Sequence, residues 1–449
     1  RKGIKIRSAS SIQFLILQRK TRHFHLIAVF FGMEIESVME IPHINCDRFA
    51  PKRRRIFSDS PPPPPPKVRI TAIYEEKVPY LSSNESSGVT TDTASIFSSR
   101  NASPHNDPSP SPIDDKEGHY VYQLGEILTS RYKIHKSMGK GTFGQVLECW
   151  DEKNNEMVAV KIIRANKQYR EDAKIEIEML EKLNKHKRTH NHCVKIRNWF
   201  DYRNHICIVF EKLGPSLYEF LRSNNYRSFP LNLVREIGKQ LLECVAYMHD
   251  LNLIHTDLKP ENVLLVSSEY STVFDRKGGK RVPKSSDIKV IDFGSTTYDE
   301  NDQSYVVSTR HYRAPEVILG IGWSYPCDLW SVGCILFELC TGDTLFETRE
   351  DLEHLAMMER VIGEFPYSMM KKAKGSFVRH GRLDWPRGAS SSESVEFVRE
   401  TPRLKSLVRD HVDDASGDFY DLLGRLLRHD PYYRLTALEA LRHRFFTRM

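Results

Sequence analysis

The segment Gly139–Val146, with the sequence GKGTFGQV, constrains the fold more strongly than any other part of the chain. Its glycines follow the pattern GxGxxG, and the residues directly after it, Leu147–Trp150, have the pattern of a β-strand and not of a helix. A dinucleotide-binding turn with the same glycines must open a helix. We therefore expect a glycine-rich hairpin whose backbone amides can approach phosphate oxygens, because glycine has no Cβ in the way.

A lysine and a glutamate follow this hairpin. Val158–Lys161 alternates like a strand with Lys161 on one side, and Glu176 stands in a helical pattern with Ile177 and Leu180. Taken singly, each charged residue would be an ordinary surface group. At this spacing from the glycines, Lys161 can reach the α- and β-phosphates of a nucleotide, and Glu176 can hold its ammonium in position.

Two segments farther along carry the chemistry of phosphoryl transfer. In His255–Asn262 (HTDLKPEN), Asp257 can accept the proton of an attacking hydroxyl, and Asn262 can bind magnesium together with the aspartate of Asp292–Gly294 (DFG). Three more landmarks follow in order: APE at 314–316, DLWSVG at 328–333 and Arg434. The ordered set predicts an α+β, bilobal protein-kinase fold with a small β-rich N-lobe and a larger helical C-lobe.

Residues 120–446 resemble the eukaryotic protein kinases, and within them the LAMMER group, also called the CDC-like or Clk kinases. The signature of that group, EHLAMMER, stands letter for letter at Glu353–Arg360. Three further motifs match as well, at Asn198–Tyr202, Ser308–Arg313 and His255–Asp257. The sequence of these motifs is most similar to that of the plant members. The resemblance implies a dual-specificity protein kinase that uses ATP and Mg²⁺. We expect EHLAMMER itself to form an amphipathic helix packed on the large lobe.

The resemblance also implies a nucleotide site, residue by residue. Val146 and Ala159 would enclose the adenine, Phe210 would be the gatekeeper beside it, and backbone groups of Glu211 and Leu213 would contact the base. The full set of implied ATP-binding positions is Met138, Gly139, Lys140, Gly141, Thr142, Phe143, Gly144, Val146, Ala159, Lys161, Phe210, Glu211 and Leu213.

The catalytic and structural roles carry over in the same way. Asp257 would be the catalytic base, Lys259 would contact the γ-phosphate, and Thr309 would hydrogen-bond both of them. Lys161 would pair with Glu176 as well as with the phosphates. The implied magnesium ligands are Asn262 and Asp292, and the implied structural residues are Asp328 and the buried ion pair of Glu316 and Arg434.

The chain departs from most kinases at Thr256, where an arginine usually stands. That arginine grips a phosphate on the activation loop through a charge-assisted pair that orders the loop. Threonine has no cation. We therefore expect an enzyme that is active without a phosphate docked at this position, as the resemblance also implies. Ser304, Tyr305, Ser308 and Thr309 are still open to modification.

Two insertions lengthen the C-lobe. Asn262 and Asp292 are 30 positions apart, whereas the simplest kinases use about 13 in the same layout of motifs. The extra stretch, 266–287, contains Gly278-Gly279, a turn signal between polar flanks, so a short β-hairpin and a disordered loop both stay open. Residues 374–400, rich in Ser, Gly and charge, form a second insertion whose function the sequence does not indicate.

The first 118 residues have no pattern of a folded domain. The chain starts at Arg1, and we favour upstream sequence from a gene model for residues 1–32, over an Arg-rich transit peptide or an ordinary disordered tail. Residues 33–118 are first basic and then rich in Ser and Pro, with 12 Ser and 11 Pro from 56 to 118, which predicts disorder. We place the N-lobe at 119–213, the C-lobe at 214–446 and a short tail at 447–449.

Charge and composition support this division. Residues 1–55 contain 12 Lys/Arg and 4 Asp/Glu, whereas the remaining 394 residues contain 54 and 55, so the net charge of +7 belongs to the head. The cluster Pro51–Arg55 is a candidate import signal, which predicts a nuclear protein, and Pro61–Pro66 is a stiff spacer more readily than a ligand for an aromatic groove. Charges at 19–22 interrupt the apolar runs of the head, so no membrane span is expected. The eight cysteines lack CxxC spacing, and a reduced compartment is the default.

The expected substrates are splicing factors rich in Arg/Ser repeats, as the resemblance implies, bound by a monomeric enzyme. Such cationic peptides need acidic surface near the active site, and the candidates are Asp299, Glu300, Asp302, Glu347, Glu350 and Asp351. A scaffold without catalytic activity is disfavoured because the residues needed for catalysis are all present: Lys161, Asp257, Asn262 and Asp292. A tyrosine-regulated or MAP-type kinase would need a Tyr-x-Tyr or Thr-x-Tyr pair where Val306–Thr309 stands. Direct binding of nucleic acid is not expected, because no RRM, zinc or helix-turn-helix pattern accompanies the basic head.

Overall fold

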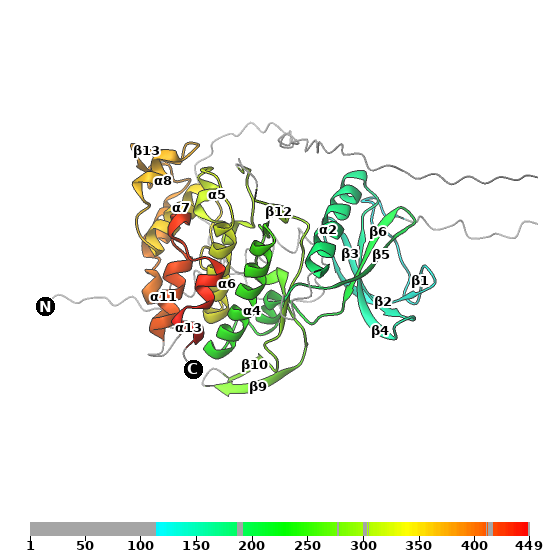
Figure 1. Cartoon of the computed structure of the whole chain (residues 1–449). Coiled ribbons are helices and arrows are strands. Elements are labelled where there is room, and N and C mark those ends of the chain that lie inside the picture. Colours follow the sequence, from blue (N-terminus) through cyan, green and yellow to red (C-terminus); the bar gives the residue numbers. More distant parts are fainter. Residues whose placement is uncertain are drawn as a thin grey trace, which may run out of the picture. The chain divides into compact units, whose positions relative to one another are not determined.

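The computed structural model describes residues 114–185, 192–275, 278–299, 303, 305–409, 411 and 416–447. All of them belong to one compact unit, Pro110–Met449. Within it, a β-sheet lobe with helix α2 is followed by a helical lobe (Figure 1), which confirms the predicted bilobal kinase fold. The expectations for residues 1–32, for the basic cluster and for the proline run lie outside the described residues.

The N-lobe is a six-stranded antiparallel sheet in the order β1-β2-β3-β4-β6-β5. Its strands are β1 (Ile127–Leu128), β2 (Tyr132–Lys140), β3 (Gly144–Asp151), β4 (Glu156–Ile163), β5 (Ile196–Tyr202) and β6 (His205–Glu211). The predicted glycine-rich hairpin is the turn between β2 and β3. Alternate residues of β3 and β4, such as Leu147 and Val160, are fully buried in the sheet's core, and helix α2 (Lys167–Lys185) packs on the sheet through Ile177 and Leu180.

The N-lobe begins earlier than the sequence indicated. Residues 114–118, which we expected in the disordered tail, pack on the sheet. The carboxylate of Asp114 lies 2.9 Å from Nε2 of the fully buried His205, and the ammonium of Lys140 donates to Asp115 over 2.9 Å. The amide of Ala165 donates to the carbonyl of Gly118. These partners are 25 to 91 positions away in the chain, so local composition gave no sign of them.

The C-lobe is built around helix α6, whose residues Cys327 to Thr341 are all buried. A helix that is apolar on every side belongs in the centre of a lobe. The other helices are α3 (Leu217–Ser223), α4 (Leu231–Asp250), α5 (Pro315–Ile318), α7 (Asp351–Val361), α8 (Tyr367–Lys372), α9 (Ser392–Glu400), α10 (Leu404–Arg409), α11 (Ser416–Leu426), α12 (Ala437–Leu441) and α13 (Arg444–Thr447). Helix α13 continues one residue past the expected end of the lobe at 446.

Short strands carry the catalytic motifs. Strand β7 (Leu253–Ile254) pairs with β12 (Thr297–Tyr298), and β8 (Val263–Leu265) pairs with β11 (Ile288–Val290). In the second pair Val263 lies opposite Val290. Because β8 begins directly after Asn262 and β11 ends two residues before Asp292, this register brings the two implied magnesium ligands to the same end of the ladder.

The EHLAMMER segment is helix α7, as expected. Its side chains Leu355 and Met358 are fully buried, together with His354. Glu353 is also buried: one carboxylate oxygen accepts from the hydroxyl of Ser394 and the other from the amide of Arg349, both at 2.8 Å. The helix therefore packs on the lobe over most of its surface, more completely than an amphipathic pattern requires.

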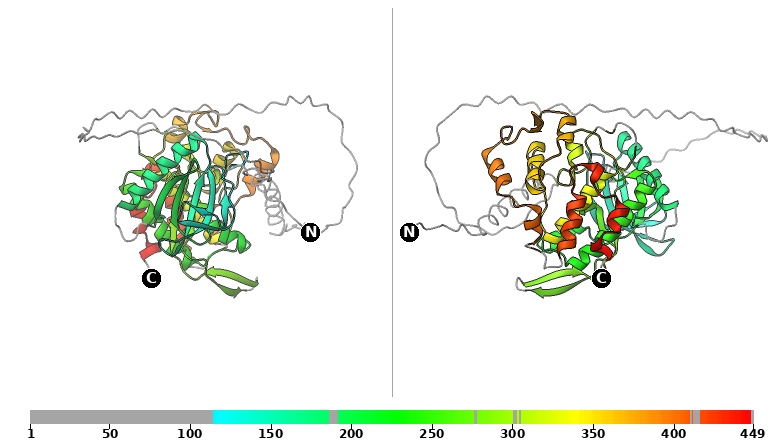
Figure 2. Two further views of the ribbon diagram at one scale, coloured as in Figure 1. Left: turned by 90° about the vertical axis from the view of Figure 1, so that its right-hand side faces the viewer. Right: turned by 60° about the vertical axis from the view of Figure 1, so that its left-hand side comes forward.

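The first insertion is a β-hairpin. Strands β9 (Tyr270–Asp275) and β10 (Gly278–Pro283) are antiparallel, with Tyr270 opposite Pro283 at one end and Asp275 opposite Gly278 at the other. The hairpin projects from the C-lobe (Figure 2). The expected position of the turn is wrong. Gly278 and Gly279 pair with Asp275 and Phe274 and so belong to β10, which leaves residues 276–277 between the strands.

The second insertion is folded too. It contains the two-stranded ladder of β13 (Val378–Arg379) with β14 (Arg382–Leu383) and the whole of helix α9. Ser391 caps α9 by accepting from the amide of Ser394, and Val398 of the helix is buried. Since Ser394 also donates to Glu353 of α7, this insertion braces the EHLAMMER helix.

Two further features concern membrane spans and the state of the cysteines. Within the described ranges, no helix is long and apolar enough to cross a membrane. The seven cysteines found in those ranges are buried and free of disulfides, and burial raises the pKa of the Cys149 thiol to about 12.

Candidate active site

A lysine and two acidic residues meet where the two lobes join. The ammonium of Lys161, on β4, lies 2.8 and 2.9 Å from the two carboxylate oxygens of Glu176 on α2. It is also 3.6 Å from Oδ1 of Asp292. Burial by itself would lower the pKa of Lys161, but the two carboxylates outweigh burial and raise it. The group is therefore a fixed cation that can face phosphate oxygens.

The second cluster surrounds Asp257. Its Oδ2 lies 2.6 Å from the ammonium of Lys259, and its Oδ1 accepts from both the amide and the hydroxyl of Thr309 at 2.8 Å. Lys259 also donates to the Thr309 hydroxyl over 3.0 Å. The hydrogen bonds expected of Thr309 are thus both present. Burial raises the pKa of Asp257, but Lys259 and Thr309 lower it by more, so the carboxylate is ionised at neutral pH.

The backbone that carries Asp257 is held by Asp328 of α6. Oδ2 of Asp328 accepts from the amide of His255 at 2.9 Å, and Oδ1 accepts from the amide of Thr256 at 3.0 Å. Thr256 has a φ of +69°, a conformation that costs energy for any residue other than glycine. His249 contributes a third contact, 3.0 Å from Oδ2. The buried Asp328 therefore keeps the loop in its strained form and so fixes the direction of the base.

Asn262 and Asp292 have the donor set that magnesium prefers, one amide oxygen and one carboxylate. The amide nitrogen of Asn262 donates to the carbonyl of Asp257 over 2.9 Å, which orients its oxygen away from that bond. The Asp292 side chain is 41% exposed, and Asp292 has a φ of +64°. The residues present fit a hard divalent cation, which would neutralise charge on the phosphate oxygens.

Packing inside the protein requires glycine at only one of the three glycine positions of the hairpin. A Cβ on Gly144 would lie 2.2 Å from the carbonyl oxygen of Ile162, whereas a Cβ on Gly139 or Gly141 would meet no protein atom within 4 Å. The turn is closed by the amide of Gly141, which donates to the carbonyl of Gly144. Packing within the protein thus requires glycine at 144, and the other two are left to the role that the sequence predicts, close approach to phosphate.

Side chains of this hairpin point to the protein as well. The ammonium of Lys140 is paired with the carboxylate of Asp115, so its side chain is directed to the N-terminal segment. Arg164 donates to the carbonyl of Thr142 over 3.0 Å. Phe143 is exposed at the tip and makes an edge contact with Tyr169 of α2. The hairpin is therefore braced from the N-terminal segment and from α2.

The residues expected around adenine lie on three neighbouring strands. Val146 of β3 pairs with Lys161, and Ala159 of β4 pairs with Phe210 of β6. Glu211 ends β6, and its amide donates to the carbonyl of Lys195, so that amide is not available to a base. Two positions remain from the expected set: Leu213 is buried after β6, and Met138 is exposed on β2.

The buried ion pair is present. The guanidinium of Arg434 forms two parallel hydrogen bonds, of 2.6 and 2.8 Å, with the carboxylate of Glu316. Both side chains have no exposed surface. Arg434 also donates to the carbonyl of Pro326 at the start of α6 and lies over the ring of Trp330. The pair therefore ties the APE motif on α5 to the centre of the lobe.

Sequence reasoning missed Glu261, which lies between Asp257 and Asn262. Its Oε2 is buried and has no hydrogen-bond partner among the described residues. Burial raises its pKa, although a hydrogen bond from its own backbone amide and the charge of Lys259 lower it in part. The residue was visible inside the motif HTDLKPEN, but nothing in the sequence showed that one buried oxygen of its carboxylate would be left without a partner.

Comparisons with known proteins agree with this site. The family described as protein kinase domain matches residues 132–446. The serine/threonine-protein kinase AFC2 of Arabidopsis thaliana is 59% identical over 427 residues, 93% of this chain and 100% of that protein. The dual specificity protein kinase CLK2 of Homo sapiens is 46% identical over 343 residues, 75% of this chain and 68% of that protein. A crystal structure of a kinase domain matches with a TM-score of 0.68 at 38% identity, over 74% of this chain and 100% of that one.

The fold and the site define the class: an enzyme that transfers phosphate to protein hydroxyl groups. The chain belongs to the protein kinase family and, within it, to the LAMMER kinases. It is a dual-specificity protein kinase for Ser, Thr and Tyr. The family uses ATP and a divalent cation.

Proposed function

We propose that this kinase transfers the γ-phosphate of ATP, bound with Mg²⁺, to serine and threonine in Arg/Ser-rich splicing factors, and to tyrosine by autophosphorylation. It would act as a nuclear monomer and regulate mRNA splicing. Lys161 and Lys259 would neutralise the phosphates, Asn262 and Asp292 would hold the cation, and Asp257 would orient the attacking hydroxyl and take its proton.

The observation that favours a cationic substrate is Glu261. A carboxylate beside the catalytic base, with a buried oxygen that has no partner among the described residues, is costly unless a ligand satisfies it. An arginine of the substrate is a suitable partner, because its guanidinium matches a carboxylate in two parallel hydrogen bonds. The pKa of Glu261, raised by burial, would fall when such a cation binds.

The acidic surface expected from the sequence is smaller than the six candidates suggested. Asp351 is already paired with Arg310 and, at 3.6 Å, with Arg313, so it is not free for a substrate. Asp299 and Glu350 are exposed, and Glu347 is partly buried. The remaining two candidates, residues 300 and 302, lie outside the described residues.

The test compares phosphate transfer from labelled ATP to an Arg/Ser-repeat protein and to a generic basic protein. Preference for the repeat protein supports the proposal, and equal transfer contradicts it. Glu261→Gln should raise KM for an Arg/Ser peptide about tenfold, the worth of one charge-assisted pair, with kcat unchanged. Glu396→Gln, an exposed residue on α9, is the control and should change neither constant.

A further inference from the structure

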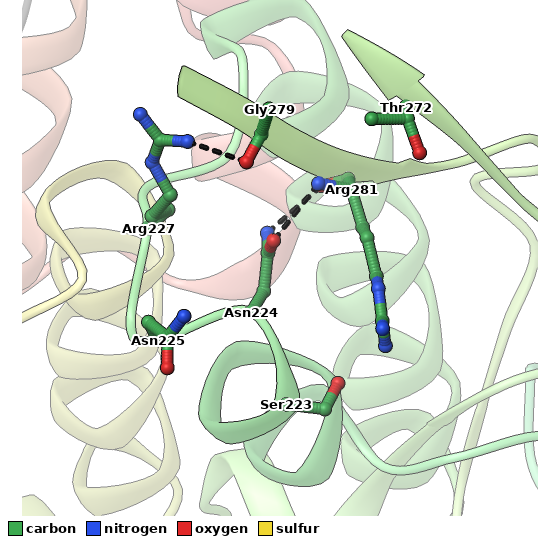
Figure 3. A pocket seen from close by; sticks show the side chains of 7 residues that line it. All are labelled: Ser223, Asn224, Asn225, Arg227, Thr272, Gly279 and Arg281. Atoms are coloured by element: carbon green, nitrogen blue, oxygen red, sulfur yellow. Dashed lines mark hydrogen bonds between the residues drawn. The ribbon is translucent and has the colours of Figure 1, made fainter. Parts of the chain in front are cut away.

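A polar pocket of about 490 Å³ lies between the C-terminal end of α3 and the hairpin β9–β10 (Figure 3). None of the residues that line it belongs to the nucleotide or catalytic positions described above. They are Ser223, Asn224, Asn225, Arg227, Thr272, Gly279 and Arg281.

Four hydrogen bonds fix the walls of this pocket. The side-chain amide of the buried Asn224 donates to the carbonyl of Arg281 and accepts from its backbone amide, both at 2.8 Å. The guanidinium of Arg227 donates to the carbonyls of Gly278 and Gly279 over 3.0 and 2.7 Å. The hairpin is therefore attached to the end of α3, and the pocket is formed before any ligand arrives.

The pocket is cationic. The stretch 220–230 contains Arg222 and Arg227 and no acidic residue, and the stretch 278–283 contains Lys280 and Arg281 and no acidic residue. The guanidinium of Arg281 lies over the ring of Tyr270, 4.8 Å from its centre. No carboxylate among the described residues pairs with Arg281. A contact through the face of the guanidinium leaves its N–H donors at the edge for a ligand.

The chemistry of the lining suits a phosphate group. Arg281 offers a planar set of donors, and its side chain extends from the hairpin toward Ser223, while Thr272 and Asn225 line other parts of the pocket (Figure 3). The volume exceeds what a phosphate alone needs and leaves room for the side chain and backbone that carry it. Sites for single-stranded nucleic acid instead combine positive charge with aromatic rings that stack on bases, and no residue that lines this pocket is aromatic.

We propose that this pocket binds phosphoserine in a protein substrate that the enzyme has already partly phosphorylated. The inference rests on the proposed function, because serines phosphorylated in turn along an Arg/Ser repeat supply phosphoserine and unmodified serine on one chain. The phosphorylated part occupies the pocket, which raises the local concentration of the remaining serines at Asp257. Phosphorylation of long repeats is therefore favoured once it has begun.

The experiment uses the full chain and two forms of one Arg/Ser peptide, one unmodified and one with two phosphoserines at one end. Arg281→Gln should weaken binding of the phosphorylated peptide about tenfold in fluorescence anisotropy, and Arg281→Lys less, because lysine keeps the charge without the fork. KM for the phosphorylated peptide should rise with kcat unchanged. Arg379→Gln, an exposed arginine on β13, is the matched control and should bind like the wild type.

Equal affinity of the wild type and Arg281→Gln for the phosphorylated peptide would overturn the proposal. It would also be overturned if Arg281→Gln weakened binding of a single-stranded RNA but not of the phosphopeptide. Thr272→Ala provides a second variant at the same wall. Failure of the proposed function has a different signature: the unmodified Arg/Ser peptide would then receive no phosphate, whatever residue stands at 281.

Discussion

The hydroxyl of Thr256 donates a hydrogen bond to the carbonyl oxygen of Ser295, 2.9 Å away. Ser295 directly follows the DFG motif, so this bond attaches the start of the activation segment to the catalytic loop. At the far end of the segment, the hydroxyl of Ser308 donates to the carbonyl of Thr256 over 2.6 Å, and Arg313 donates to the carbonyl of Ser308 over 2.8 Å. Hydrogen bonds to backbone carbonyls, without a phosphate, thus occupy the place where most kinases use an arginine and a phosphate.

The first prediction concerns activation. Because these bonds need no phosphate, enzyme treated with phosphatase should keep its activity within about threefold of the untreated enzyme. Mass spectrometry must show that residues 303–313 carry no phosphate, and initial rates with a peptide substrate give the activity. A phosphatase-treated preparation without activity would show that a modified residue, and not Thr256, orders the segment.

The second prediction concerns the ion pair of Lys161 and Glu176. Glu176→Gln removes the charge that holds the ammonium, so Lys161 no longer stays fixed toward the phosphates. We expect kcat/KM to fall at least about tenfold, since this pair must be in place for transfer. Glu178→Gln, on the same helix but exposed, is the control. If both variants keep wild-type kinetics, the pair has no part in the reaction.

The third prediction concerns Glu316 and Arg434. Removing one partner leaves a buried charge without compensation, so Glu316→Gln and Arg434→Met should each lower the free energy of unfolding by about 3–5 kcal/mol. The double variant leaves no isolated charge and should lose less than the sum of the two. Urea denaturation followed by fluorescence measures all three. Strictly additive losses would mean that the two side chains do not interact.

The fourth prediction concerns pH. Burial, helped by Arg434, lowers the pKa of His429 to about 4, although its hydrogen bond to the carbonyl of Gly363 raises it in part. The unfolded chain binds this proton near the ordinary pKa of 6.5 and the folded one only near 4. The contribution of His429 to the free energy of unfolding is therefore fully present above about pH 6.5. It is lost as the pH decreases toward 4, and the loss amounts to up to about 3 kcal/mol.

His429→Gln tests this point, because glutamine can keep the hydrogen bond to Gly363 but does not titrate. Its free energy of unfolding should depend less on pH between 6.5 and 4 than that of the wild type. His135→Gln, at an exposed position on β2, should leave the pH dependence as it is. Parallel curves for wild type and His429→Gln would contradict the prediction.

The sequence predicted those features that depend on neighbouring residues or on the spacing of a known motif. The strand after Gly144 and the helix around Glu176 follow from periodicity. Contacts between side chains far apart in the sequence were not visible. Asp114 pairs with His205 and Asp115 with Lys140, so the N-lobe starts before the expected residue 119. Two acidic residues in a polar stretch do not indicate such distant partners.

Two other differences have physical reasons of the same kind. Gly278 and Gly279 suggested the turn of the hairpin, but the structure uses them in β10, where Arg227 bonds to both carbonyls. Asp351 suggested a site for a cationic substrate, but two arginines of the activation segment already occupy it. In each case the sequence showed the residue and only the folded chain showed its partner.

The central claim is that Asp257, held by Lys259 and Thr309, serves as the base for phosphoryl transfer from ATP. The most direct measurement is transfer of labelled phosphate by Asp257→Asn in the full chain, with nucleotide affinity and thermal unfolding measured in parallel. The rate should fall by at least about a hundredfold, while nucleotide affinity and unfolding temperature stay at wild-type values. A variant that binds nucleotide, stays folded and transfers phosphate at the wild-type rate would contradict the account.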